Sequence, residues 1–395
     1  MIKETREAYN AAFTSAAYQQ LLAELNQGLA RQIEFRIAET PVFLPAVFKE
    51  KLVKAGNELV AIIQQENFKQ LTQKSIPENW QVDHEKGQPH FLTFDFAVCR
   101  DANGELIPKL IELQGFPSLY AFQSELAEQF KKHFPVTRDF TPYFHHPDQQ
   151  SYFDLLRRTI VGNSAPEEVI IMDINAPEQK TAVDFYLTAR QLGIAMVALH
   201  ELLQEENQFY YLREGVKQPV KKIYNRLIFD EITDKSEAFR NVPDLLTTDQ
   251  LEWVTHPNWF YRISKYTMPF LKSEFVPATY FLSDLKTIPK DLQNYVLKPL
   301  FSFAGQGVLI DVSEADIKAI PDPGNWILQE KVTYEPVIET PEAPVKCEIR
   351  LMYLWPDDAE EPVLAISLAR LSRGKMIGVR YNKDFNWVGG TVGLF

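Results

Sequence analysis

The stretch from residue 295 to residue 312, YVLKPLFSFAGQGVLIDV, combines a lysine and two glycines in a pattern suited to holding phosphate groups. Its composition predicts a strand ending at Lys298, a loop that contains Gly305 and Gly307, and a second strand from Val308. Glycine lets backbone N–H groups approach an anion closely, and the lysine neutralises charge. A plain hairpin with a glycine tip is the alternative. No GxxxxGK[ST] sequence occurs in the chain, so this is not a P-loop.

A second set of residues lies in a predicted β-hairpin. Apolar and polar residues alternate over residues 91–99 and again over 106–114, with Asn103-Gly104 between them. Asn-Gly is typical of a two-residue hairpin turn. Pairing outward from that turn places Asp95 directly opposite Glu112 on one face of the sheet.

Two carboxylates in opposite positions repel each other, so this hairpin needs a cation. Mg²⁺, with oxygen ligands and a nucleotide phosphate completing its shell, fits that need. Gln114 pairs with Thr93 on the same face and offers an amide oxygen. A solvated acidic face is the alternative, and a one-residue change in the turn would separate the two acids.

Further candidates flank the glycine loop. Lys265 lies in a helix-like run before it, 33 residues before Lys298, and taken alone it is interpreted as a surface lysine. The apolar run WILQEKV, residues 326–332, predicts a strand whose backbone could bind an adenine edge, with Glu335 within reach of a ribose. An ordinary buried strand is the alternative.

The helices and strands expected around these residues indicate an α/β (α+β) fold. Helical spacing of apolar residues continues to about residue 80, strand-like and helix-like segments alternate from Glu168, and strands at 346–355, 362–370 and 375–381 predict a meander. The α/β part is Rossmann-like but lacks GxGxxG, so dinucleotide binding is not supported. The expected regions are an N-terminal helical cap (1–88), the acidic hairpin region (89–150), a Rossmann-like domain (151–245) and the nucleotide-binding lobes (246–395).

Composition narrows the class of protein. The net charge of −12 and the pI near 5.2 argue against nucleic-acid and acidic-membrane partners. Cys99 and Cys347 lie in strand-like runs, which leaves no disulfide framework and favours a reducing compartment. The N-terminus lacks a signal pattern and no apolar run has the length of a membrane span, so we expect a cytoplasmic protein.

Taken in order, these motifs resemble the ATP-grasp superfamily, in which two lysines bracket the nucleotide phosphates and a hinge strand holds adenine. The acidic hairpin precedes the glycine loop here, which is similar to the circularly permuted domain of the glutathionylspermidine synthase family. The resemblance covers about residues 89–395. It implies that Asp95 and Glu112 bind Mg²⁺ and that Lys265 and Lys298 bind the phosphates of ATP.

This sequence departs from the family pattern at two positions. The family asparagine is Gln114 here, and the family arginine two residues before the aspartate is Thr93. Stabilisation of the terminal phosphate would then fall to Arg370, Arg373 or Arg380.

A second correspondence competes with the first. The C-terminal run also looks like the closing strands of unpermuted glutathione-synthetase-type enzymes, where an acid, an arginine and an asparagine bind metal and phosphate. Under it the ligands are Glu348, Arg370 and either Asn382 or Asn386.

The resemblance implies an ATP-dependent carboxylate–amine ligase that forms an amide through an acylphosphate, with a small-molecule carboxylate and an amine as substrates. The alternatives are a nucleotide-binding protein without catalysis and a small-molecule phosphotransferase. The sequence leaves the oligomeric state open. The expected nucleotide-binding residues are Lys265, Lys298, Gly305, Gln306, Gly307, Gln329, Glu330, Val332 and Glu335; the expected metal ligands are Asp95, Glu112, Gln114, Glu348, Asn382 and Asn386.

Overall fold

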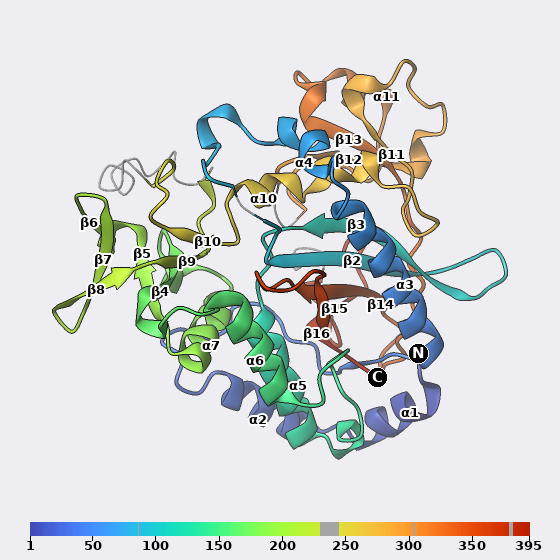
Figure 1. The fold of residues 1–395 in the computed structure, drawn as a ribbon. Coiled ribbons are helices and arrows are strands. Elements are labelled where there is room, and N and C mark those ends of the chain that lie inside the picture. Colours follow the sequence, from blue (N-terminus) through green and yellow to red (C-terminus); the bar gives the residue numbers. More distant parts are fainter. Residues whose placement is uncertain (86, 230–244, 303–304, 379–381) are drawn as a thin grey trace.

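A six-stranded sheet runs through the centre of the molecule and joins the early and late parts of the chain (Figure 1). The structure is a computed structural model, and it describes residues 1–85, 87–229, 245–302, 305–378 and 382–395. The strand order is β1-β16-β15-β14-β2-β3. The strands are β1 (Val42–Phe43), β2 (Phe91–Arg100), β3 (Leu106–Gln114), β14 (Lys346–Leu354), β15 (Val363–Ser372) and β16 (Gly389–Leu394).

The β2–β3 hairpin confirms that Asp95 lies directly opposite Glu112. The predicted two-residue turn is wrong, because residues 102–104 form a longer loop in which Gly104 has a φ of +80°. This loop shifts the register by one residue, and a bulge at Ile111 shifts it back before the acids are reached. The two deviations cancel, so both carboxylates lie on one face.

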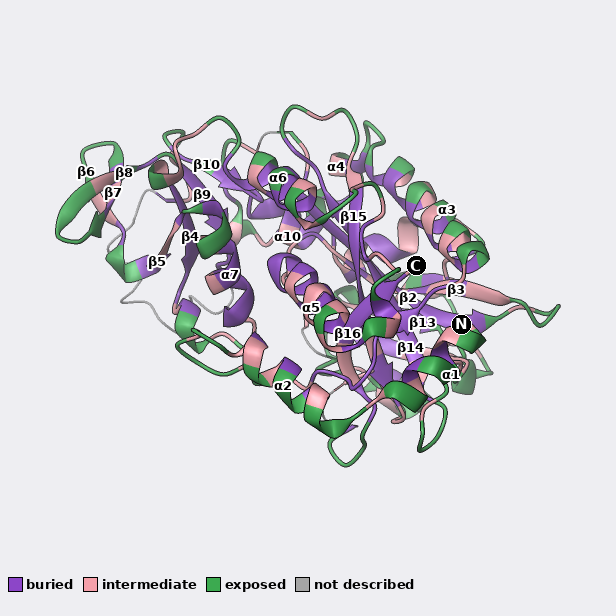
Figure 2. Ribbon diagram, turned by 90° about the horizontal axis from the view of Figure 1, so that it is seen from below, coloured by how far each residue is buried: buried purple, intermediate pink, exposed green. Residues whose placement is uncertain are grey.

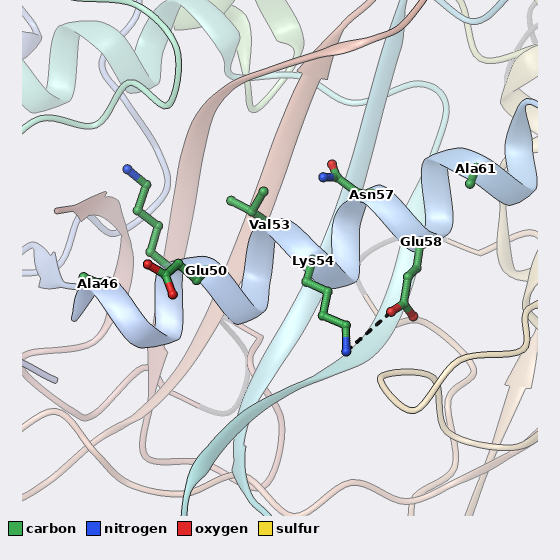
Figure 3. A pocket seen from close by; sticks show the side chains of 8 residues that line it. Ala46, Glu50, Val53, Lys54, Asn57, Glu58 and Ala61 are labelled. Carbon is green, nitrogen blue, oxygen red and sulfur yellow. Dashed lines mark ion pairs between the residues drawn. The ribbon is translucent and has the colours of Figure 1, made fainter.

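Helix α3 (Ala46–Ile63) covers the apolar face of this sheet, where Leu52 packs in one core with Phe94. The helix lies so close at Gly56 that an added Cβ would overlap the hydroxyl of Tyr353. Its outer face carries an open depression of about 730 Å³ that is lined by α3 residues alone (Figure 3). No predicted site residue lines that depression.

The opposite face of the sheet is apolar at one end only. There Phe91 packs edge-on against Tyr120 of α5 (Tyr120–His133), and the Tyr120 hydroxyl donates to the carbonyl of Tyr353 at 2.9 Å. Figure 2 shows that most strands of this sheet are buried while the outer sides of the helices are exposed. Further along this face, Asp95 on β2 and charged side chains on the neighbouring strands replace the apolar ones. The other helices of this core are α1 (Lys3–Ala12), α2 (Ser15–Leu25), α6 (Gln149–Ile160) and α7 (Ala182–Leu192).

A four-stranded parallel sheet, in the order β10-β9-β4-β5, confirms the predicted alternation of strands and helices. A small antiparallel sheet projects from it (Figure 1). The parallel strands are β4 (Val169–Asp173), β5 (Ala195–Ala198), β9 (Lys222–Asn225) and β10 (Glu252–Val254), and the projecting ones are β6 (Leu203–Glu205), β7 (Gln208–Arg213) and β8 (Val216–Val220).

A separate three-stranded sheet, in the order β11-β13-β12, carries the lysine and glycine stretch. The predicted second strand from Val308 is not formed; a single bridge joins Leu297 to Leu309. The elements are β11 (Thr279–Phe281), β12 (Tyr295–Pro299) and β13 (Trp326–Glu330), with the helices α4 (Phe68–Leu71), α10 (Asn258–Arg262) and α11 (Glu314–Lys318) and the 3₁₀ helix η8 (Lys265–Phe270).

The predicted C-terminal meander is correct for two of its three strands. Residues 375–378 form bends, and residues 379–381 lie outside the described part of the chain. The strand beside β15 is instead β16, whose glycines gave no strand signal. No helix in the described ranges combines the length and the apolarity needed to cross a bilayer.

Candidate functional site

Five charged residues from four strands meet on one face of the six-stranded sheet and are named the charge cluster. They are Asp95 on β2, Glu112 on β3, Glu348 and Arg350 on β14, and Arg370 on β15. Strand register brings them together, because Asp95 lies between Glu112 and Arg350, and Glu348 lies opposite Arg370. The acidic hairpin and the C-terminal run, which the sequence left as competing sites, therefore contribute to one cluster.

The two arginines hold the acids through short hydrogen bonds. Arg350 donates from Nε and Nη2 to the two oxygens of Asp95 at 2.5 and 2.6 Å, which is the bidentate geometry of a strong pair. Nη2 of Arg370 donates to Oδ2 of Asp95 at 2.6 Å and also to Oε1 of Glu348. The hydroxyl of Tyr334 donates to the other oxygen of Glu348 at 2.8 Å.

Burial raises the pKa of Asp95 and of Glu348, whereas the charge of the neighbouring arginines lowers it. Burial favours a raised pKa for Asp95, but the charges of Arg350 and Arg370 outweigh burial, so the pKa of Asp95 is lowered. Burial raises the pKa of Glu348, and the charges of Asp95 and Glu112 add to the increase, while Arg370 and the hydrogen bond from Tyr334 oppose it. Of the two acids Asp95 and Glu348, Asp95 is therefore the one whose surroundings favour the ionised form.

Two buried lysines lie beside the cluster. Lys298 on β12 donates from Nζ to the carbonyl of Ile111, the bulged residue of β3, at 3.0 Å. Lys265 on η8 donates from Nζ to the carbonyl of Ser302 at 2.8 Å. Both lysines are 8 % exposed, and neither forms an ion pair with a described residue.

These lysines lie in an environment that disfavours their charge. Burial lowers the pKa of Lys298 to about 8, and the positive charge of Lys265 adds to this while Glu112 opposes it. Burial also lowers the pKa of Lys265, again opposed by Glu112. A bound anion would compensate for the lost hydration of both ammonium groups.

A small cavity of about 90 Å³ lies where β3 meets η8 and the segment that follows β12. Polar side chains in its wall come from Glu112, Gln114, Ser264, Lys265 and Ser302, and aromatic and aliphatic side chains form most of the rest. Gly115 allows this close approach, because an added Cβ would lie 2.5 Å from the carbonyl oxygen of Trp259. The cavity thus joins the acidic hairpin to the lysine-bearing elements.

The glycine loop and strand β13 flank the lysines. Gly305 and Gly307 both have a φ of +74°, a conformation that glycine adopts without strain. Gln329 is 2 % exposed, and its Nε2 has no hydrogen-bond partner in the part of the chain that the structure describes. Val332, just after β13, forms no backbone hydrogen bond with the residues that the structure describes. Both are the kind of unpaired polar group that a ligand could satisfy.

Comparison with solved structures identifies the fold. The chain matches a glutathione synthetase-like effector from Globodera pallida in its apo form, with a TM-score of 0.59. The fold is that of a glutathione synthetase-like protein. The match covers 96% of this chain and 97% of the effector at 11% sequence identity. The sequence matches no protein-family model and no curated protein.

The ATP-grasp arrangement that the sequence motifs suggest stays a prediction, because this likeness shows the overall fold alone. The likeness concerns the arrangement of the whole chain and does not test the circular permutation, which stays a prediction. The mixed α/β architecture with several sheets agrees with the predicted fold class.

The predicted metal ligands fit Mg²⁺ unequally. Both oxygens of Asp95 accept from arginines, and both oxygens of Glu348 accept from Arg370 or Tyr334. Glu112 keeps one oxygen without a donor among the described residues, since only Oε1 accepts from Gln114, at 3.0 Å. In the described residues, no three His, Cys, Asp or Glu side chains are grouped to hold a metal ion.

The other C-terminal candidates make contacts of their own. Asn382 accepts through Oδ1 from the N–H of Arg373 at 2.9 Å and so fixes the end of β15. Asn386 and Arg373 both donate to Glu342, at 2.8 Å each. These contacts give Asn382, Asn386 and Arg373 structural partners away from Asp95. Arg380 lies outside the described residues.

Two predicted nucleotide contacts already have partners. Glu330 accepts from the N–H of Ala278 at 3.3 Å, and Glu335 forms an ion pair with Arg100 at 2.9 Å. Gln306 is exposed in the glycine loop.

Sequence reasoning missed Arg350 and Tyr334 as members of the site. The one available signal for Arg350 was the Glu-x-Arg spacing at Glu348, which places two charges on the same face of a strand. Two charged residues on one face of an otherwise apolar strand indicate buried ion pairs, provided that the neighbouring strand carries residues of opposite charge.

Proposed function

We propose that this protein is an ATP-dependent carboxylate–amine ligase. The observation that carries the proposal is the pair of buried ammonium groups, Lys265 and Lys298. Among the residues that the structure describes, they donate only to carbonyl and hydroxyl groups, and Glu112 lies close by. Buried cations without a counter-ion are costly, so the site is suited to a polyanion. A glutathione synthetase-like fold supports ATP as that polyanion.

The proposed reaction has two steps. A substrate carboxylate attacks the terminal phosphorus of ATP, which gives an acylphosphate and releases ADP. An amine then attacks the acyl carbon, loses a proton and expels phosphate, which leaves an amide. Such chemistry depends on positioning and charge neutralisation and needs no nucleophilic side chain.

The described residues suggest a division of roles. Lys265 and Lys298 would neutralise the phosphate chain, and the backbone of Val332 would bind the adenine edge. Glu112 and Gln114 would supply oxygens to Mg²⁺, which adds charge neutralisation when it is bound.

The substrate side of the site is expected near the carboxyl ends of the parallel strands, where open α/β sheets bind ligands. Arg226, at the end of β9, donates to the carbonyl of Pro117 at 2.8 Å and lies 4.1 Å from the centroid of the Phe116 ring. Phe116 also lines the cavity at Lys265. The loop that holds Phe116 therefore connects the two regions.

The binding part of the proposal is tested by a thermal shift with Mg²⁺ and a non-hydrolysable ATP analogue. An analogue at about a hundred times its dissociation constant stabilises the wild type by roughly 2.7 kcal/mol. We expect Lys298→Ala to lose most of that shift, while Lys318→Ala, an exposed lysine on α11, keeps it. An equal shift in both variants would remove Lys298 from the phosphate site.

The catalytic part is tested by ADP release across a panel of carboxylates and amines. The proposal requires release that depends on both substrates together. A stable phosphorylated product that forms without any amine would indicate a phosphotransferase.

A second candidate is a nucleotide-binding protein without turnover. Arg350 and Arg370 donate hydrogen bonds to Asp95 and leave it unable to bind a metal ion. This arrangement favours a nucleotide-binding protein without turnover. Nucleotide binding that does not need Mg²⁺, with no ADP release from any substrate pair, would establish this alternative.

A further inference from the structure

Asp95 and Glu348 form an acid pair with a cation already placed between them. A single nitrogen, Nη2 of Arg370, donates both to Oδ2 of Asp95 and to Oε1 of Glu348. Asp95 is 1 % exposed and Glu348 is 2 % exposed, so bulk water does not screen this contact. A divalent ion bridging the same two carboxylates would occupy the position of that nitrogen.

The other oxygens of the pair are also satisfied. Arg350 holds both oxygens of Asp95, and Tyr334 donates to Oε2 of Glu348. Negative charge is therefore matched by guanidinium groups in the ligand-free protein, and no metal is needed for charge balance at these acids.

Arg370 still has hydrogen-bond donors to offer. Its Nε is buried and has no partner, and its Nη1 forms no hydrogen bond with any described residue. The side chain is 32 % exposed, whereas Asp95 and Glu348 below it are buried. Nη1 therefore keeps two N–H groups, and a charged N–H donor of this kind can form a strong hydrogen bond with a phosphate oxygen.

We propose that Arg370 is the fixed cation of this site. It takes the place of a divalent ion between Asp95 and Glu348 and presents the N–H groups of Nη1 to a phosphate group of the ligand. The choice of phosphate rests on the proposed function, whereas the replacement of the metal ion rests on the hydrogen bonds alone.

The first test uses Mn²⁺ and the full-length protein without nucleotide, with bound metal measured by electron paramagnetic resonance. We expect no Mn²⁺ site at this acid pair in the wild type. Arg370→Met should bind one additional Mn²⁺ per chain, and the double variant Arg370→Met, Glu348→Gln should lose it again. A wild-type Mn²⁺ site that Glu348→Gln abolishes would overturn the proposal.

The second test uses inorganic tripolyphosphate without metal and reads the shift in melting temperature. The wild type should be stabilised, Arg370→Met should lose the larger part of the shift, and Arg370→Lys should recover some of it because it keeps the charge but not the guanidinium group. Arg158→Met, which removes an exposed ion pair with Asp358, is the control and should behave as wild type.

An undiminished tripolyphosphate shift in Arg370→Met would overturn the phosphate contact. Neither test involves turnover, so a failure to release ADP would count against the ligase proposal and not against this one. If Arg370→Met does not fold, Arg370→Lys serves in its place. Its ammonium group still neutralises Asp95 and Glu348 but loses the additional contact with the phosphate.

Discussion

The protonation state of Lys298 is the residue-scale property most open to measurement. Burial and the charge of Lys265 lower its pKa to about 8 from an ordinary value of 10.5. Between these values the unfolded chain binds more protons than the folded one. The free energy of unfolding of the ligand-free protein therefore gains a contribution from Lys298 as pH rises through that window.

Binding of the ATP analogue should respond to pH in the opposite sense. Above about pH 8 Lys298 loses its proton, so the affinity should fall, approaching about tenfold per pH unit. Isothermal titration calorimetry across this range measures the change. Lys298→Arg keeps its charge and should show a much flatter profile. A wild-type profile as flat as that of the arginine variant would show that Lys298 does not contact the phosphates.

Individual residues also show which parts of the site could be predicted from the sequence. The facing positions of Asp95 and Glu112 followed from local alternation around one turn. The partner of Asp95 did not, because Arg350 lies 255 residues away and nothing local specifies that β14 pairs with β2. The burial of Lys298 could not be predicted from the sequence either, because it depends on contact with the carbonyl of Ile111 on another sheet.

At the scale of elements, the β2–β3 hairpin shows how a correct result can follow from a wrong intermediate. Composition predicted a two-residue turn, whereas the loop is longer and Gly104 takes the left-handed conformation. The compensating bulge at Ile111 carries no composition signal. Its carbonyl accepts from Lys298, so the bulge both corrects the register and forms part of the site.

Close packing of α3 on the sheet gives a prediction at this scale. Alanine normally stabilises a helix relative to glycine by up to about 1 kcal/mol. Gly56→Ala should instead destabilise the protein by about 1–3 kcal/mol, because its Cβ would overlap the hydroxyl of Tyr353. Chemical denaturation measures the free energy of unfolding.

The matching control is Tyr353→Phe. The Tyr353 hydroxyl is buried without a partner, so its removal should cost little on its own and should recover much of the loss in the double variant. Equal destabilisation of Gly56→Ala with and without the hydroxyl would show that the overlap is not the cause.

At the scale of the whole molecule, the sheet order makes the last strand an internal one. β16 lies between β1 and β15, with Gly393 beside Val42 and Val392 beside Leu368. We expect a variant without residues 389–395 to lack a cooperative thermal transition, as followed by circular dichroism. The same number of residues inserted at Glu214-Gly215, in the exposed β7–β8 turn, should leave the transition intact. A folded truncated protein would show that β16 is dispensable.

The charge cluster has a consequence for synthesis on the ribosome. Asp95 precedes Arg350 by 255 residues and Arg370 by 275. At typical elongation rates the first interval lasts on the order of 10 to 50 seconds. Throughout it neither guanidinium group has been made, so any pairing of β2 with β3 leaves Asp95 opposite Glu112 without these cations. The arrival of the two arginines, and not the formation of the hairpin, therefore sets the moment at which the site reaches charge balance.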